Sequence, residues 1–154
     1  MPDSATASLD ARVRHLEDLE AIRRLLLDYG TFVDTRQFER CSQLFTATAE
    51  YDVGFTTVIG PAGALGVLHG MTDGLMKPEP GDDFHVYTNF SIDLEGDRAT
   101  ARSFWQFIAP DEQGHPRIAH FGHYDDVVVR EGSVWKFQRR AALRDIGVPP
   151  EEFA

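Results

Sequence analysis

The residues of this chain whose chemistry stands out are one aspartate and a small set of histidines. Asp34 follows directly on Val33, at the end of an apolar helical stripe. A carboxylate at that point either caps the following helix or points into a cavity that the helix lines. A neutral imidazole can remove a proton from a carbon next to a carbonyl group, and a buried carboxylate beside it fixes its tautomer. Such a pair would perform general acid–base chemistry, and we expect no cofactor.

His85 opens a stretch that alternates like a β-strand. It shares one face of that strand with Tyr87, Asn89 and further polar residues, whereas Val86 and Phe90 lie on an apolar face. The polar face looks either to solvent or into a polar-lined cavity. The alternation leaves both interpretations open.

Strand parity also separates two further histidines. His120 and His123 differ by an odd number of residues, so a regular strand points them to opposite faces. This argues against a metal site that both would share, and we expect no metal. His123 shares its face with Phe121 and Val127, an apolar setting apart from Asp125, and is therefore our candidate for a pocket residue.

Aromatic side chains are concentrated in the expected strands and near them. They either fill an ordinary core or line an apolar pocket at the open end of a sheet. Tyr29, at helical spacing in the apolar stripe before Asp34, allows the same two interpretations. The candidates for the pocket wall are Tyr51, Phe55, Trp105, Phe107 and Phe121, together with His123.

The hydrophobic pattern places helices first. Apolar residues recur at steps of three and four from Leu19 to Val33, which predicts a long helix with Asp18 as its N-cap. A separate helical turn over Ser8–His15 precedes it, and a short second helix over Gln37–Phe45 follows it. Both Asp34 interpretations therefore concern the junction of two helices.

Strands dominate the remainder of the chain. Short glycine-containing turns between the last of them predict an antiparallel meander, and helices followed by such a sheet define an α+β fold. Residues 54–70 otherwise predict irregular backbone, and residues 71–76 a short helix. The expected strands are Ala49–Val53, Thr56–Ile59, His85–Leu94, Arg98–Ala109, Arg117–Val129 and Val134–Leu143.

Composition narrows the possible partners. The 154 residues predict one domain, with residues 1–7 disordered. A formal charge of −10 repels phosphate backbones and anionic membrane surfaces, so we expect neither nucleic acid nor membrane as a partner. The chain shows no signal peptide and no apolar run of about 20 residues, which predicts a cytoplasmic protein. Cys41 is the single cysteine and reads as a core residue.

Three segments carry a family resemblance: FVDTRQF, FHVYTN and GSVWKFQRR. Together with the helix before them, they resemble the SnoaL-like group of the nuclear transport factor 2-like, cystatin-type fold. Within that group the sequence is most similar to the branch of scytalone dehydratase, bile-acid dehydratases and hexachlorocyclohexane dehydrochlorinase. The similarity runs from Leu16 to Arg140. It implies a cone in which N-terminal helices pack on a strongly curved, mostly antiparallel sheet.

The resemblance also implies roles for particular residues. An aspartate at the end of the first helix pairs with a histidine at the start of a long strand in that branch, and these positions match Asp34 and His85. The bile-acid dehydratases place a tyrosine five residues before the aspartate, which matches Tyr29. A pocket tyrosine of scytalone dehydratase corresponds to Tyr51.

Some positions depart from that branch. Scytalone dehydratase has a second histidine where this chain reads Phe107-Ile108-Ala109-Pro110, and its paired serine and asparagine fall near Phe121 and His123. Scytalone itself is therefore a poor candidate for the substrate.

The resulting hypothesis is a cofactor-independent dehydratase of a small hydrophobic hydroxy-carbonyl compound, such as a polyketide, a steroid or an aromatic. A non-catalytic ligand-binding or assembly module with the same cavity is the alternative from another class. Polyketide cyclisation, isomerisation and epoxide hydrolysis are other chemistries of this fold. The resemblance further implies a homo-oligomer, a dimer or a trimer, because relatives often pack their sheets face to face.

Overall fold

The computed structural model describes residues 8–73, 76–77 and 79–146, so the disorder predicted for residues 1–7 lies outside the described part of the chain. Helices come first and long strands afterwards, as the sequence predicts. The elements are α1 (Leu9–Asp34), α2 (Phe38–Ser42), β1 (Phe45–Asp52), β2 (Thr57–Ile59), α3 (Gly60–Met71), β3 (Phe84–Glu95), β4 (Arg98–Pro110), β5 (Pro116–Glu131) and β6 (Val134–Ile146).

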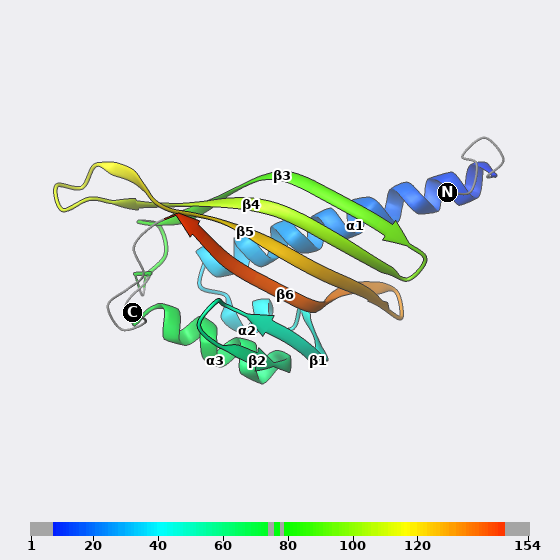
Figure 1. Ribbon diagram of the computed structural model, residues 1–154, viewed down its shortest axis with the longest axis horizontal. Helices are drawn as coiled ribbons and strands as arrows, with labels where there is room; N and C mark the ends of the chain where they lie inside the picture. Colours follow the sequence, from blue (N-terminus) through cyan, green and yellow to red (C-terminus); the bar gives the residue numbers. More distant parts are fainter. Residues whose placement is uncertain (1–7, 74–75, 78, 147–154) are drawn as a thin grey trace.

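All strands form a single six-stranded sheet in the order β2-β1-β6-β5-β4-β3. The four long strands make the antiparallel meander that the sequence predicts, and β1 joins β6 in parallel. Helix α1 runs along one face of the meander, while α2 and α3 lie beside β1 and β2 (Figure 1). The α+β fold class is therefore correct.

Helix α1 is longer than predicted and begins at a different cap. Ser8 is the N-cap, and its hydroxyl accepts a hydrogen bond from the Ala11 N–H at 3.2 Å. Asp18, predicted to be the cap, lies inside the helix and instead accepts from the Trp135 indole at 3.2 Å. It also pairs with Arg130 at 2.6 Å. The separate turn over Ser8–His15 is part of this one continuous helix.

Helix α3 corrects the expectation of irregular backbone over residues 54–70. Its glycines lower helix propensity, but Pro61 fits the first turn, and Ala64 and Leu68 are buried one turn apart. Tertiary packing of that apolar side outweighs the weak local preference. Met71 ends α3, so the predicted helix over residues 71–76 does not start there, and residues 74–75 lie outside the described part.

Strand β3 changes its inward face partway along. Asn89 adopts a left-handed φ of 54°, and the pairing with β4 shifts between Thr88 and Ser91. Before this bulge His85 and Tyr87 face inward, and after it Phe90 and its alternate neighbours pack on the core. The bulge explains why simple alternation could not decide which face of this strand is buried.

Two charged residues lie at the centre of the core. Arg140 donates to Asp126 through Nε and Nη2, both at 2.9 Å, and both side chains are 0% exposed. The Arg140 guanidinium also lies 4.0 Å above the Tyr29 ring and 3.9 Å from the Tyr124 ring. Burial raises the pKa of Asp126, and the adjacent guanidinium opposes that rise.

The sheet exposes several large apolar side chains: Phe84, Phe104, Phe121 and Ile146. A second copy of the chain packed on this surface would cover these side chains. Homo-oligomerisation stays a prediction. Within the described ranges, none of the helices combines the length and the apolar character needed to cross a membrane.

The close contact between Gly30 of α1 and Tyr87 of β3 can be tested by substitution, with Gly66 of α3 as the control. A Cβ added at Gly30 of α1 would lie 2.2 Å from a carbon of the Tyr87 ring, whereas one added at Gly66 of α3 would meet nothing within 4 Å. We expect Gly30→Ala to lower the free energy of unfolding by about 1–3 kcal/mol, because overpacking outweighs the gain in helix propensity. Gly66→Ala should raise it by roughly 0.5–1 kcal/mol. Urea unfolding of both variants measures the difference, and equal effects would contradict the proposed contact.

Candidate active site

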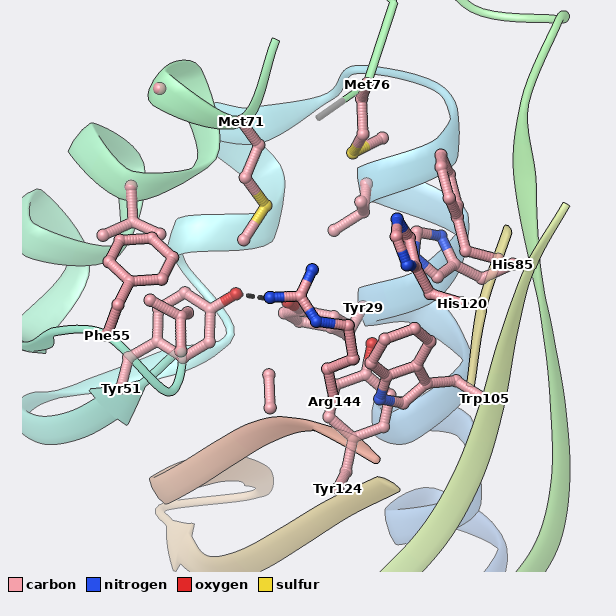
Figure 2. Close-up of a pocket in the computed structure, with 16 residues that line it drawn as sticks. Tyr29, Tyr51, Phe55, Met71, Met76, His85, Trp105, His120, Tyr124 and Arg144 are labelled. Atoms are coloured by element: carbon pink, nitrogen blue, oxygen red, sulfur yellow. Dashed lines mark hydrogen bonds between the residues drawn. The ribbon is translucent and has the colours of Figure 1, made fainter. Parts of the chain in front are cut away.

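A cavity of about 240 Å³ lies between the helices and the inner face of the sheet. Its wall is mostly apolar, with a few polar side chains that converge on it (Figure 2). Six of the residues expected in the pocket do line it: Tyr29, Tyr51, Phe55, His85, Trp105 and Phe107. Its other lining residues are Val33, Val53, Val67, Gly70, Met71, Met76, His120, Tyr124, Ala142 and Arg144.

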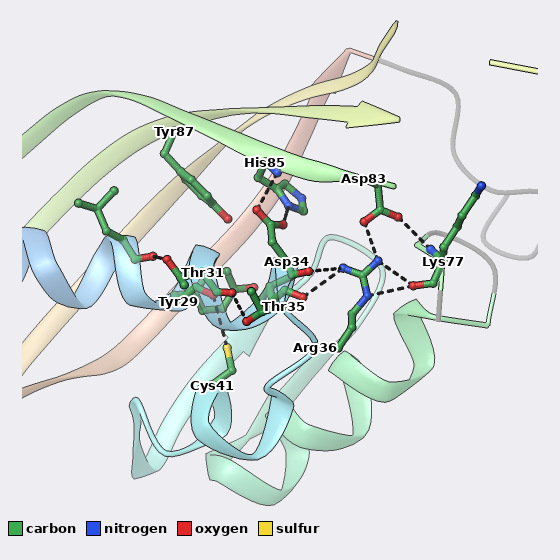
Figure 3. A network of polar contacts seen from close by, with 12 residues as sticks. Tyr29, Thr31, Asp34, Thr35, Arg36, Cys41, Lys77, Asp83, His85 and Tyr87 are labelled. Carbon is green, nitrogen blue, oxygen red and sulfur yellow. Dashed lines mark hydrogen bonds and ion pairs between the residues drawn. The ribbon is translucent and has the colours of Figure 1, made fainter. Parts of the chain in front are cut away.

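Asp34 and His85 form a doubly hydrogen-bonded pair at one side of this cavity (Figure 3). The ring Nδ1 of His85 lies 2.7 Å from Asp34 Oδ1, and the backbone N–H of His85 donates to Oδ2 at 2.9 Å. The side chains are 18% and 12% exposed for Asp34 and His85 respectively. Asp34 is the last residue of α1, and the N-cap of α2 is Gln37, so the helix-cap interpretation of Asp34 does not hold.

This geometry fixes the state of the imidazole. An ionised carboxylate can only accept hydrogen bonds, so a neutral His85 must carry its proton on Nδ1. Its Nε2 is then unprotonated and available as a base. Since His85 lines the cavity, the arrangement can accept a proton from a bound molecule while Asp34 stabilises the imidazolium.

Tyrosines form a second polar group in the cavity. The hydroxyls of Tyr29 and Tyr51 lie 2.5 Å apart, and those of Tyr87 and Tyr124 lie 3.4 Å apart. Burial raises the pKa of Tyr29 and Tyr51 and raises that of Tyr124 to about 12. At neutral pH these groups therefore stay protonated and can donate hydrogen bonds.

His120, and not His123, is the second histidine of the cavity. Its ring stacks on Phe107 with centroids 6.0 Å apart and an interplanar angle of 8°. Its Nδ1 is buried and has no hydrogen-bond partner within the described residues. Burial lowers the pKa of His120, and the nearby Arg144 and Arg117 lower it further, so the imidazole is neutral at pH 7.

The prediction that His123 and Phe121 line the pocket is wrong. His123 lies away from the cavity, where Asp145 holds its Nδ1 at 2.7 Å and Asp125 lies 3.5 Å from its Nε2. Phe121 is 38% exposed. Alternation predicts the more apolar row of β5 as the inner face, whereas the structure buries the row of Tyr124 and Asp126, where the Asp126 carboxylate pairs with buried Arg140.

Gly122 is the sequence signal that could have identified this inner row. A Cβ at this position would lie 2.1 Å from a Trp105 ring carbon and 2.2 Å from the Leu143 carbonyl oxygen. A glycine in the middle of a long strand often marks such a close approach. It leaves the space in which the Trp105 indole crosses β5.

Arg144 is the main functional candidate that sequence reasoning missed. Its side chain extends into the cavity toward the Tyr51 hydroxyl (Figure 2). The strand predicted over Val134–Leu143 ended one residue before it, whereas β6 continues to Ile146. It adds a guanidinium cation to a mostly apolar wall. In the described part of the chain, no three histidine, cysteine or acidic side chains are grouped so that they could hold a metal ion.

Residues 14–141 match the family of SnoaL-like domains, and the chain belongs to that family. It is 29% identical over 142 residues to Rv2910c of Mycobacterium tuberculosis, an uncharacterized protein, with 86% of this chain and 88% of that protein covered. An identical level of similarity links it to the uncharacterized protein Mb2934c of Mycobacterium bovis.

Solved structures define the fold. An NTF2-like protein with a cystatin-like fold from Novosphingobium aromaticivorans superposes with a TM-score of 0.78 at 27% identity, covering 96% of this chain and 94% of that chain. A protein described as a candidate scytalone dehydratase from the same species gives a TM-score of 0.71 at 24% identity, covering 86% and 87%. The chain therefore has the nuclear transport factor 2-like fold that the resemblance implied.

A second aspartate–histidine pair, Asp145 with His123, allows a matched test of the His85 tautomer. In ¹⁵N NMR spectra of the histidine rings, neutral His85 should show a protonated Nδ1 and an unprotonated Nε2. Asp34→Asn should disturb that pattern, because the amide no longer provides two acceptor oxygens. Asp145→Asn removes the carboxylate beside His123 and should leave the His85 signals unchanged. A His85 pattern that Asp34→Asn does not alter would contradict the pairing.

His120 predicts a pH dependence of stability. Its pKa is lowered in the folded protein, so the unfolded chain binds more protons once the pH falls below about 6.5. The contribution of His120 is therefore fully present above that pH and is lost as the pH falls through its folded pKa. Between pH 7.5 and pH 5.5, wild type should lose more unfolding free energy than His120→Gln, as urea titrations at both pH values would show. The same substitution at the exposed loop residue His115 serves as the control.

Proposed function

We propose that this protein is a cofactor-independent lyase that removes water from a small hydrophobic hydroxy-carbonyl compound. The observation that supports this most directly is the Asp34–His85 pair, whose imidazole base faces an apolar cavity. Its assignment to the dehydratase branch of the SnoaL-like family is part of the proposal. A solved structure described as a candidate scytalone dehydratase shares the fold, and the residue pair provides the chemistry.

The proposed reaction uses His85 twice. Nε2 of His85 removes the proton from the carbon next to the substrate carbonyl, and the electron pair of that C–H bond forms an enolate. The enolate then collapses to a C=C bond as the bond between the β-carbon and its hydroxyl breaks. The leaving hydroxide takes the proton back from the His85 imidazolium and departs as water. Asp34 stabilises the cationic ring between these two steps.

Arg144 and Tyr51 are suited to the substrate carbonyl. The guanidinium extends toward the Tyr51 hydroxyl, so an oxygen placed near both would receive two donors (Figure 2). Negative charge develops on that oxygen only when the enolate forms, and preorganised donors in a water-poor site stabilise it strongly. Tyr29, bonded to the Tyr51 hydroxyl at 2.5 Å, would hold that phenol in position.

The cavity restricts the class of substrate. A volume of about 240 Å³ lined by Phe55, Trp105 and Phe107 fits a compact ring compound. Proton-transfer isomerisation is a second candidate function, because the same single base could return the proton to another carbon of the substrate. The two reactions share the proton abstraction. In the dehydration the proton returns to a leaving hydroxide, and in the isomerisation it returns to a carbon.

The test uses solvent deuterium. Candidate β-hydroxy ketones and keto compounds without a leaving group are incubated with the protein in D₂O and followed by ¹H NMR. A dehydratase produces the unsaturated ketone from the former, and any active proton-abstracting site exchanges α-hydrogens of the latter. Asp34→Asn and His85→Ala should each lower both rates at least about a hundred-fold, since general base catalysis contributes 10²–10⁴-fold.

Stability separates the catalytic role from a structural one. Thermal unfolding of both variants should stay close to wild type. Asp145→Asn should retain full activity, because Asp145 pairs with His123, which lies away from the cavity. Loss of folding in both dyad variants would make the pair structural. Ligand binding without exchange or elimination by wild type would instead identify a binding module.

A further inference from the structure

Helix α1 ends in a backbone conformation that glycine normally adopts. The Arg36 N–H donates to the Val33 carbonyl at 3.1 Å and the Gln37 N–H to the Phe32 carbonyl at 2.8 Å, the two hydrogen bonds of a Schellman motif. Arg36 occupies the left-handed position of that motif with a φ of 58°. Glycine adopts this conformation without steric cost, and arginine does not. The surrounding structure must therefore hold Arg36 in this conformation, and strained positions of this kind cluster at functional sites.

The Arg36 side chain is saturated with hydrogen bonds. A guanidinium has five N–H donors, and Arg36 makes five hydrogen bonds. Nε and Nη2 donate to the Lys77 carbonyl at 2.9 and 2.7 Å, and Nη1 donates to the carbonyls of Val33 and Asp34. Nη2 also reaches Asp83 Oδ1 at 2.6 Å. The side chains of Arg36 and Asp83 are 8% and 2% exposed.

Asp83 completes a clamp around one peptide segment. Its Oδ2 accepts from the Lys77 N–H at 2.9 Å, so the backbone of Lys77 is held on both sides, by Arg36 and by Asp83. Met76, the residue before Lys77, is buried and forms part of the cavity wall. Asp83 also lies two residues before His85, and Arg36 lies two residues after Asp34 (Figure 3).

We propose that Arg36 and Asp83 are positioning residues of the site. Together they hold the Asp34 carboxylate and the His85 ring at hydrogen-bonding distance, and they keep the Met76 side chain in the cavity wall. Neither side chain lines the cavity, so both act through the residues that do. The catalytic consequence rests on the proposed function, whereas the clamp itself is a property of the ligand-free protein. The clamp also explains why position 36 carries an arginine, although glycine is the usual residue at this position after a helix.

The experiment follows the NMR signals of Met76 and His85, the two cavity residues that the clamp is proposed to position. Protein labelled with ¹³C in the methionine methyl groups and ¹⁵N in the histidine rings is compared as wild type, Asp83→Asn and Asp82→Asn. Asp82 is the matched control, because this adjacent carboxylate is 69% exposed and pairs with the exposed Lys77 Nζ at 3.4 Å, whereas Asp83 binds the Lys77 backbone N–H. Met76→Leu and His85→Ala assign the two reporter signals. Asp83→Asn should shift the Met76 methyl signal and mix the tautomers of His85, and Asp82→Asn should move neither.

A second substitution separates the clamp from general stability. Arg36→Lys retains the positive charge beside Asp83 but loses the planar fork of donors. It should also shift both reporters, and it decides the question if Asp83→Asn does not fold. Wild-type signals of Met76 and His85 in a folded variant would overturn the proposal, as would a lowered melting temperature with both signals unmoved.

Turnover provides the remaining measurement once a substrate has been found in the deuterium experiment. Asp83→Asn should lower the elimination or exchange rate about 10–100-fold, because small misplacements of reacting groups have effects of this order. The two proposals fail in distinguishable ways. An absence of catalysis in wild type would overturn the proposed function and leave the reporter shifts unaffected. Full activity of a variant with shifted reporters would overturn the positioning role.

Discussion

The buried pair of Asp126 and Arg140 is a constraint that the arrangement of the sheet interior has to satisfy. Both side chains are fully buried, and a charge in that position must be paired, because removing one partner leaves an uncompensated ion. Pairing them fixes the inward row of β5, and with it the positions of His120 and Tyr124. Since the Arg140 guanidinium also lies against the rings of Tyr29 and Tyr124, the same ion pair supports the tyrosine side of the cavity.

Two residues with a left-handed backbone conformation, Asn89 and Arg36, help to orient other residues of the site. The bulge at Asn89 lets β3 turn His85 inward at one end and pack its apolar row on the core at the other. The left-handed Arg36, two residues after Asp34, follows the end of α1 and places its guanidinium against Asp83, just before β3. The irregular positions thus lie at or near the candidate site, where proteins tolerate unfavourable conformations for functional reasons.

The charge distribution bears on the proposed substrate. A net charge of −10 opposes the approach of anions, yet the cavity contains the Arg144 cation. A neutral hydroxy-carbonyl compound would meet no such long-range repulsion, and its hydrogen bond to Arg144 would strengthen as its oxygen becomes negative. An interaction that strengthens in the transition state is the kind that accelerates a reaction.

The sequence by itself determined the long N-terminal helix, the antiparallel meander and the junction at which Asp34 stands. These features depend on local periodicity and on turn residues, which one stretch of chain is sufficient to define. The Asp34–His85 pairing was accessible only through the family resemblance, because no local pattern relates residues 51 positions apart in the chain.

Only the tertiary structure decided which faces turn inward. Alternation favoured His123 and Phe121 because their row is the more apolar, whereas the paired charges of Asp126 and Arg140 reverse that choice. Helix α3 forms despite its glycines because Ala64 and Leu68 find a core to pack against. Arg144 is identified as a cavity residue only when β6 lies beside β5. In each case the deciding energy comes from contacts between distant segments, which local sequence patterns do not contain.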